Sequence, residues 1–240
     1  MTFLLVWEGL PRLGLVDPFL LPSFSDVIGS LGKLAVSGEM LKHITSSMSR
    51  SGLGFLLAVT FSIITGFVVG WFKRVERVMN LLLEAGRNTS TLALYPVFIL
   101  VFGLGEVSKI AIITWGATWP TLLNTINGVK NVDPLLIKMA RSMGISKIGL
   151  FFKVILPMSL PSIAVGLRLS AASSLLILVA AEMLGANKGL GFMTFYYQER
   201  YAIPEMYGGI ITISIIGLIV NILMVKLERR MTVWKEKAVK

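Results

Sequence analysis

Residues 138–161 read KMARSMGISKIGLFFKVILPMSLP and separate two long apolar stretches of the chain. The segment is cationic, its apolar residues recur at helical spacing, and prolines stand at positions 157 and 161. An ordered amphipathic loop contributes little to the folding of neighbouring membrane spans. It therefore indicates a surface that a partner outside the membrane binds.

The composition is that of an integral membrane protein. Of 240 residues, 55% are hydrophobic and 15% are charged, with a mean hydropathy of +0.78, whereas soluble domains carry about a quarter charged residues. Topology explains the net charge of +10 better than nucleic-acid binding does, because Lys and Arg gather on the cytoplasmic side of membrane proteins. Cys is absent and His43 is the one histidine, so thiol chemistry, a multi-His metal site and a Ser-His-Asp triad have no basis.

Charge-free runs predict an all-α membrane protein with five core spans. The spans are Ser51–Phe72, Asn88–Gly105, Ile110–Val129, Ser162–Gly185 and Met206–Val225. Met1–Trp7 is too short to cross a membrane, and it is either the tail of a partial sixth helix or a short surface anchor.

Basic residues define the orientation. Most Lys and Arg lie in the segments 73–87, 130–153 and 226–240, which fall on one side if the spans alternate. The positive-inside rule makes that side cytoplasmic. Residues 12–50 and 186–205 then face outward.

The N-terminal 50 residues are predicted to be separate from a core that covers residues 51–240. Within them, Ser23–Val36 places its apolar residues on one face, which suits a helix lying on the outer membrane surface. The core ends in a cytoplasmic tail, residues 226–240.

The cytoplasmic loop 128–161 predicts two short helices joined by a turn. Asp133 followed by Pro134 is a helix start, and Gly144 is a helix stop. A second helical stretch covers Ser146–Ile155, and two Leu-Pro pairs close the segment before the next span. A helix exposed in this way presents apolar side chains to a groove in a partner.

The loop resembles the cytoplasmic EAA loop of ABC importer permeases, E-A-A-x-x-x-G-x9-I-x-L-P. Ala140, Gly144, Leu156 and Pro157 match it, and Val154 replaces the isoleucine conservatively. Stretches over nearly the whole chain, among them LVFGLGEVSKI, LPSIAVGLRLS, AAEMLGANKGLGF and LERRMTVW, are similar to the subfamily that imports nitrate, sulfonates and taurine. The resemblance implies a MetI-like, type I importer permease in a bacterial cytoplasmic membrane.

The resemblance also implies partners. They are two ATPase subunits that bind ATP and Mg, a second permease copy and an extracytoplasmic solute-binding protein. This chain has no G-x-x-x-x-G-K-[ST] loop, so it is expected to bind no cofactor and to catalyse nothing itself. The implied ATPase-coupling residues are Lys138, Met139, Ala140, Arg141, Gly144, Val154, Leu156 and Pro157.

The sequence departs from the family pattern in two places. Lys138 and Met139 stand where the EAA loop begins with Glu and Ala, so contacts of that carboxylate must differ here. Ser90 and Thr91 stand where the subfamily has a proline pair, so the start of that span is expected to be straighter.

Candidate pathway residues lie in two places, at Asn88, Thr89, Ser90 and Thr91 and at Glu182. For the first group, helix capping and lining a solute pathway both remain open. An ionisable group within a span faces the bundle interior or water. Glu182 therefore either lines the pathway, or lies near the outer end of its span, where it is hydrated or paired with a neighbouring side chain.

The sequence thus predicts the translocating permease subunit of an ABC importer. An ATP-independent channel or secondary carrier is the alternative, although inverted repeats and several midplane charges are not found. An intramembrane enzyme lacks a His, Asp and Ser constellation inside the spans.

Overall fold

The computed structural model describes residues 2–237, and all regular structure in that range is helical. The elements are α1 (Thr2–Arg12), α2 (Phe24–Val36), α3 (Glu39–Trp71), α4 (Lys73–Asn88), η1 (Leu92–Leu94), α5 (Tyr95–Phe102), α6 (Glu106–Lys130), α7 (Pro134–Ser142), α8 (Lys147–Leu150), η2 (Phe151–Ile155), α9 (Leu156–Gly185), α10 (Leu190–Glu199) and α11 (Ile203–Lys237). The predicted all-α fold class is therefore confirmed.

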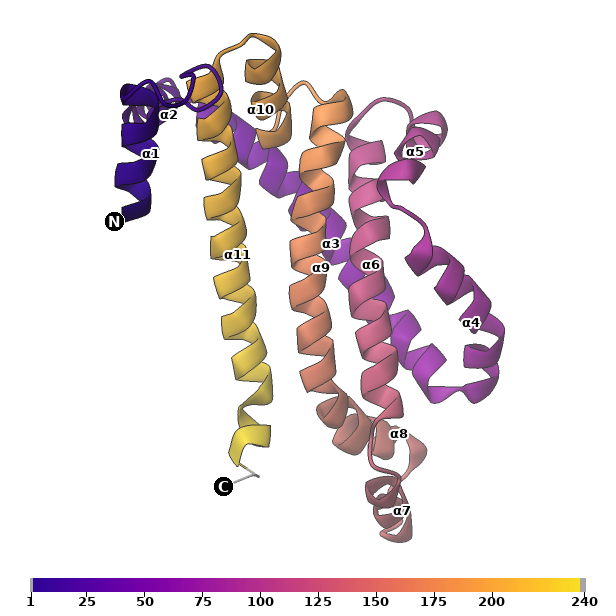
Figure 1. Cartoon of the computed structure of the whole chain (residues 1–240). Helices are drawn as coiled ribbons and strands as arrows, with labels where there is room; N and C mark the ends of the chain where they lie inside the picture. Colours follow the sequence, from indigo (N-terminus) through magenta and orange to yellow (C-terminus); the bar gives the residue numbers. More distant parts are fainter. Residues whose placement is uncertain (1, 238–240) are drawn as a thin grey trace.

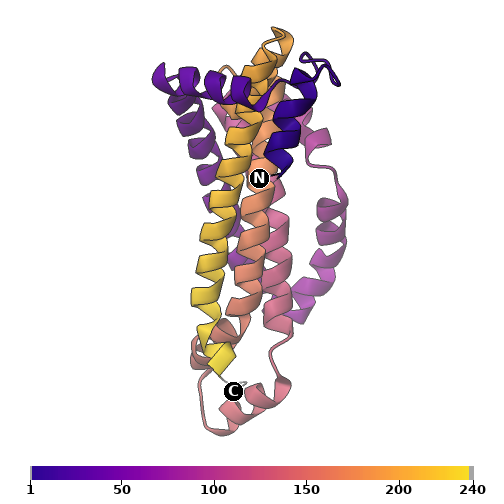
Figure 2. The ribbon, with the colours of Figure 1, turned by 60° about the vertical axis from the view of Figure 1, so that its left-hand side comes forward.

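The long helices form an elongated bundle with α6 at its centre (Figure 1). Helix α6 packs most extensively against α3 and α9, and α11 packs on α9 and α10. Helix α3 crosses obliquely behind α6 and α9 (Figure 1), and the turned view shows the same narrow bundle (Figure 2). Helices α7 and α8 lie at one end, and α1, α2 and α10 lie at the other.

Small residues bring α3 into close contact with α6. A Cβ atom added at Gly54 would lie 2.6 Å from Ile113, and one at Gly66 would lie 2.7 Å from Thr125. Ala58 and Ser62 continue this stripe at four-residue spacing and are fully buried. Such small-residue stripes are how membrane helices approach each other, because dispersion contacts replace the hydrophobic effect there.

Hydroxyl groups add hydrogen bonds between the same helices. Ser62 on α3 donates to the backbone oxygen of Thr118 at 2.9 Å. Ser170 on α9 donates to the backbone oxygen of Ala117 at 2.6 Å. Each hydroxyl is buried and satisfied, so the interfaces have a fixed register.

Three helical stretches in the described residues are long and apolar enough to cross a membrane. They are Glu39–Trp71, Lys147–Gly185 and Ile203–Thr232. The central α6 has 25 residues, which also matches a bilayer in length. The first of these stretches, α3, begins at Glu39, twelve residues before the charge-free run that starts at Ser51. The expected boundary between the N-terminal segment and the core, between residues 50 and 51, therefore falls inside α3.

The expected single span Asn88–Gly105 is wrong. Helix α4 ends at Asn88, where the chain becomes extended at Thr89, and the apolar α5 begins only at Tyr95. Thr89 caps the first helix by donating its hydroxyl to the carbonyl of Ala85 at 2.7 Å. Pro96 lies in the first turn of α5, where the missing N–H of proline breaks no hydrogen bond, so a new helix begins there. The prediction that the chain near Ser90 and Thr91 would be straighter than in the family is therefore wrong.

The N-terminal segment is helical, as predicted for Ser23–Val36. Ser23 caps α2 by accepting a hydrogen bond from the amide of Asp26. Helix α1 folds back on α2, with the backbone amide of Ser25 donating to Glu8 at 3.0 Å. That amide lowers the pKa of Glu8, and the hydroxyl of Ser25 acts in the same direction. Met1 lies outside the described residues.

Candidate functional site

The segment 128–161 forms a hairpin of two short helices at one end of the bundle (Figure 1). The carboxylate of Asp133 accepts a hydrogen bond from the amide of Leu135 at 2.8 Å and so caps α7. Pro134 occupies the first turn. Gly144 has φ of 75° and ends the helix, since the left-handed conformation is favourable mainly for glycine. The predicted start and stop of this helix are therefore confirmed.

Helix α7 turns one face to the bundle and one face away. Ala140 is buried in an apolar cluster with Val132 and Leu150. Leu135, Met139 and Met143 are 61%, 53% and 78% exposed. Their four-residue spacing places them on one side of the helix, so α7 and its C-terminal cap present an apolar stripe that no described residue covers.

The second short helix does not end before the next span. Lys147–Gly185 is one continuous helical stretch, so the expectation that the Leu-Pro pairs close the segment is wrong. A π-turn at Phe151–Ile155 explains the difference, because the amide of Leu156 donates to the carbonyl of Phe151, five residues back. A π-turn accommodates Pro157, which lacks an N–H and would otherwise clash with the preceding turn.

The structure divides the implied coupling residues into two groups. Lys138, Met139, Ala140, Arg141 and Gly144 belong to α7 and the turn after it, and Lys138 and Arg141 are exposed. Val154, Leu156 and Pro157 are half-buried where the hairpin joins α9.

At the opposite end, α3, α6 and α9 meet in a buried ion-pair network. Arg50 on α3 donates from Nη1 to Glu182 on α9 at 2.7 Å and from Nη2 to Glu106 on α6 at 2.6 Å. Glu182 is fully buried and Arg50 is 4% exposed, whereas the side chain of Glu106 is 61% exposed. One guanidinium thus joins α3, α6 and α9, and its planar fork suits two carboxylates at once.

The turn between α9 and α10 closes over this network. Ser47 donates its hydroxyl to Glu182 at 2.8 Å and accepts from the amide of Leu190 at 2.8 Å. The amide of Gly191 donates to the same carboxylate at 3.0 Å. Gly189 has φ of 125°, and a Cβ atom there would lie 2.2 Å from the Glu182 carboxylate, so glycine is required.

His43 belongs to the same cluster. It is 8% exposed, and its Nδ1 accepts a hydrogen bond from the amide of Gly189 at 3.0 Å. In the part of the chain that the structure describes, no group of His, Asp and Glu side chains has the arrangement of a metal site. The charges and hydrogen bonds of the cluster join α3, α6, α9 and the turn before α10.

Helix α10 carries a further polar contact, which is half-buried. The hydroxyl of Tyr197 donates to Glu39 at the start of α3, over 3.5 Å. Burial raises the pKa of Tyr197 to about 12, and the nearby Glu39 and Glu205 carboxylates act in the same direction.

Sequence reasoning found Glu182 and missed its partners. Arg50 was passed over because it precedes the charge-free run, and Glu106 because it follows a glycine turn. The available signal was partial: Glu106 begins α6 and Glu182 stands near the end of α9, but Arg50 stands about three turns into α3. Opposite charges at matching depth in a bundle predict such pairing.

The other candidate pathway residues lie elsewhere. Asn88, Thr89 and Ser90 are exposed in the break between α4 and α5, and Thr91 is half-buried. Thr91 packs against α6, where a Cβ atom at Gly116 would lie 3.0 Å from its methyl group. The structure therefore does not gather these residues and Glu182 into one site.

The chain is thus a bundle of apolar helices with an exposed amphipathic helix at one end and a buried charge network at the other. Residues 58–233 match the sequence profile of the family described as binding-protein-dependent transport system inner membrane component. The chain belongs to this family, and it is an ABC importer permease.

Relatives support the family and the subfamily. The chain is 35% identical over 230 residues to the putative aliphatic sulfonates transport permease protein SsuC of Bacillus subtilis (strain 168), covering 96% of this chain and 83% of the relative. It is 33% identical to the taurine transport system permease protein TauC of Escherichia coli (strain K12), covering 97% and 86%. The resemblance predicted from sequence is confirmed.

The fold is shared with a solved transporter. An inward-facing conformation of the MetNI methionine ABC transporter superposes with a TM-score of 0.73, covering 82% of this chain and 98% of that chain. The sequences are 15% identical, so this likeness supports the fold alone.

Proposed function

We propose that this permease carries a sulfonate-like organic anion across the bacterial cytoplasmic membrane and that separate ATPase subunits drive it. The names of the relatives for aliphatic sulfonates and taurine support the solute class. The uncovered apolar stripe on α7, formed by Leu135, Met139 and Met143, carries the proposal of an ATPase partner.

The stripe has the properties of an insertion surface. An isolated amphipathic helix docks by laying its apolar face into a groove of a partner. Asp133 and Gly144 fix both ends of α7, and the cluster around Ala140 holds its other face, so the helix is ordered before it binds. Little ordering entropy is then lost on docking.

The assembly that we propose has two copies of this chain, two ATPases and an extracytoplasmic solute-binding protein. ATP and Mg bind to the ATPases, and this chain binds no cofactor. The α7 end and the C-terminus face the cytoplasm, which agrees with the basic segments of the sequence. Closure of the ATPases moves both α7 helices and switches the pathway between its two sides.

Co-purification tests the coupling surface. In the triple variant Leu135→Ser, Met139→Ser and Met143→Ser, the ATPase should no longer co-purify with the permease, because an apolar insertion face has been removed. The matched control changes three exposed apolar residues at the other end, Leu13→Ser, Leu15→Ser and Val36→Ser. Equal ATPase recovery from both variants would reject the assignment of α7.

Uptake assays test the solute and the energy source. We expect saturable uptake of an alkanesulfonate or taurine that stops when the ATPase partner carries an inactive Walker lysine. Uptake that persists would favour the ATP-independent carrier. No uptake or competition by any sulfonate, with ATP hydrolysis intact, would reject the solute class.

The pathway residues remain a proposal. We propose that Asn88, Thr89 and Ser90 face the solute, because they are exposed polar groups at a helix break. Ser90→Ala should change the apparent affinity for solute without changing assembly. For Glu182→Gln, altered uptake kinetics with normal assembly would support a pathway role, and loss of assembly would support a positioning role.

A further inference from the structure

A groove at the α7–α8 end of the bundle combines positive charge with an apolar floor. It encloses about 1230 Å³ between α3, α4, α6 and the hairpin. Phe67, Trp71 and Phe151 line the floor, and Phe67 and Phe151 pack edge to face with ring centroids 5.0 Å apart. The groove is thus wide enough for a large ligand and apolar at its base.

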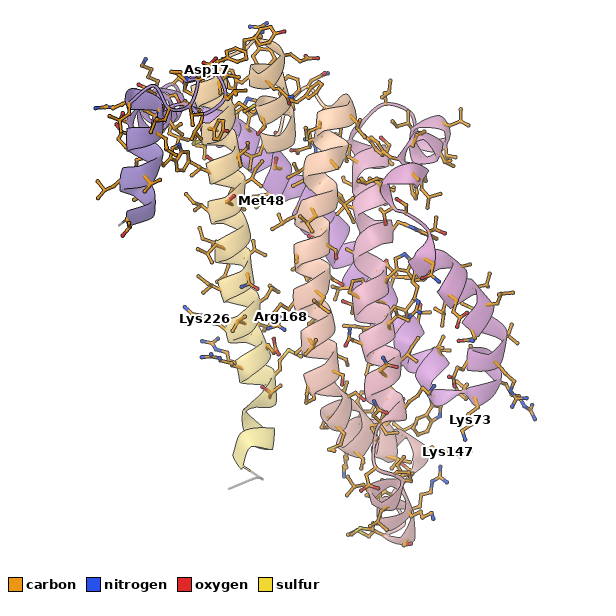
Figure 3. All side chains as sticks on the ribbon, in the orientation of Figure 1. Asp17, Met48, Lys73, Lys147, Arg168 and Lys226 are labelled. Atoms are coloured by element: carbon orange, nitrogen blue, oxygen red, sulfur yellow. The ribbon has the colours of Figure 1, made fainter. Side chains whose placement is uncertain are left out.

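Four basic side chains line the groove beside one acidic side chain. Lys130 pairs with Glu76 at 2.5 Å, so these two charges neutralise each other. Lys73, Arg141 and Lys147 also line it, and among the described residues their side chains have no acceptor. Lys73 and Lys147 stand at the same end of the molecule, one at the start of α4 and one at the start of α8 (Figure 3). The rim therefore carries three positive charges without counterions.

An exposed apolar stripe on α3 leads into the groove. Leu57, Phe61, Ile64, Val68 and Phe72 follow each other at intervals of three or four residues, and each is more than 40% exposed. Val68 and Phe72 also line the groove. A ligand that fills both surfaces has a negatively charged head and a long hydrocarbon chain.

We propose that the groove binds an anionic phospholipid from the adjacent leaflet. The phosphate and the acidic head group lie between Lys73, Arg141 and Lys147, and one acyl chain follows the α3 stripe. Basic residues at a membrane surface attract anionic lipids, and basic pockets between helices bind their head groups. The proposal depends on neither the ATPase nor the transported solute.

The lipid groove and the apolar stripe that we assign to the ATPase are on different faces of α7, and Arg141, one of the implied coupling residues, is on the groove face. Pro134, Ile137 and Arg141 face the groove, whereas Leu135 and Met139 lie on the exposed stripe. At 100° per residue the two sets are on opposite sides of the helix. An acidic protein segment is the competing occupant, and it would not use the α3 stripe.

Lipid binding to the full-length permease tests the proposal. Dioleoylphosphatidylglycerol is titrated against the detergent-solubilised protein and bound lipid is counted by native mass spectrometry, with dioleoylphosphatidylcholine as the uncharged comparison. The triple variant Lys73→Gln, Arg141→Gln and Lys147→Gln should bind the anionic lipid about a hundredfold more weakly, at roughly fivefold for each charge removed. The charge-preserving double variant Lys73→Arg and Lys147→Arg should retain binding.

A matched control removes the same charge elsewhere. The control variant Lys226→Gln, Arg229→Gln and Arg230→Gln neutralises three exposed basic residues of α11. Its affinity for the anionic lipid should stay within about threefold of that of the unaltered protein, because these residues make only weak surface contacts with lipid. Equal loss in both triple variants would overturn the proposal, because the attraction would then be nonspecific.

A second variant separates a lipid from a soluble anion. Phe61→Ser, Ile64→Ser and Val68→Ser keep every charge and remove the apolar stripe. We expect about tenfold weaker binding of the lipid, because acyl-chain contacts are lost. Unchanged lipid binding, or displacement of the lipid by millimolar inorganic phosphate, would show that the groove holds a phosphate-like anion and would overturn the proposal.

Discussion

Replacing Arg50 by methionine removes the only positive charge that contacts Glu182 among the described residues. The carboxylate is fully buried, so it cannot recruit water in place of the guanidinium. Ser47 and Gly191 still donate to it. These neutral donors compensate a buried charge only in part.

The expected cost follows from this geometry. Breaking a buried ion pair by deleting one partner destabilises a protein by about 3–5 kcal/mol, because the remaining charge is left without compensation. The Glu106 contact adds roughly 0–1 kcal/mol, since that side chain is 61% exposed and water screens it. Removing both charges of the pair in Arg50→Met/Glu182→Leu should recover about 1–3 kcal/mol relative to the sum of the single changes.

Equilibrium unfolding in mixed micelles, followed by circular dichroism, measures these changes. Arg168→Met is the matched control, because its ion pair with Glu228 at 3.3 Å has side chains that are 37% and 22% exposed. We expect the control to lose at most about 1 kcal/mol. If Arg50→Met costs no more than Arg168→Met, the network does not hold the helix ends together.

Three further changes probe other features. Gly144→Val should leave insertion intact but separate ATP hydrolysis from uptake, because φ of 75° is unfavourable for a β-branched residue, whereas Gly144→Asn should keep both coupled. Ultraviolet absorbance should show Tyr197 titrating near pH 12 in the folded protein. Because the folded pKa of Tyr197 is raised above its unfolded value of about 10, its contribution to stability is present below about pH 10 and is lost as the pH rises towards 12. Tyr197→Phe should abolish that loss of stability. Gly86→Ala would place a Cβ atom 2.0 Å from Trp119 and should destabilise the protein by about 1–3 kcal/mol in the same unfolding assay. Gly52→Ala meets nothing within 4 Å and should cost less than about 0.5 kcal/mol.

Local signals in the sequence predicted the hairpin well. The Asp133–Pro134 start and the Gly144 stop of α7 depend on capping and backbone preferences of single residues, and such preferences act over one helical turn. The family resemblance also covered most of the chain, as the profile match over residues 58–233 confirms.

Features that depend on tertiary contacts were not predicted. The break after Asn88 was missed because the run to Gly105 carries no charge, although Pro96 inside it marks a second helix start. The π-turn before Pro157 cannot be recognised from apolar spacing. Arg50 was missed because its counterions lie on α6 and α9, far away in sequence.

Helix α9 has a mechanical consequence, because it reaches from the hairpin to the charge network. The π-turn and the two prolines at its start are the places where the helix can bend. At 1.5 Å per residue the 30 residues of α9 span about 45 Å, and a tilt of about five degrees around its middle moves each end by roughly 2 Å. That displacement would take the Glu182 carboxylate out of hydrogen-bonding range of Arg50, which now lies at 2.7 Å. A displacement of α9 at one face of the membrane would therefore break the Arg50–Glu182 contact near the other face.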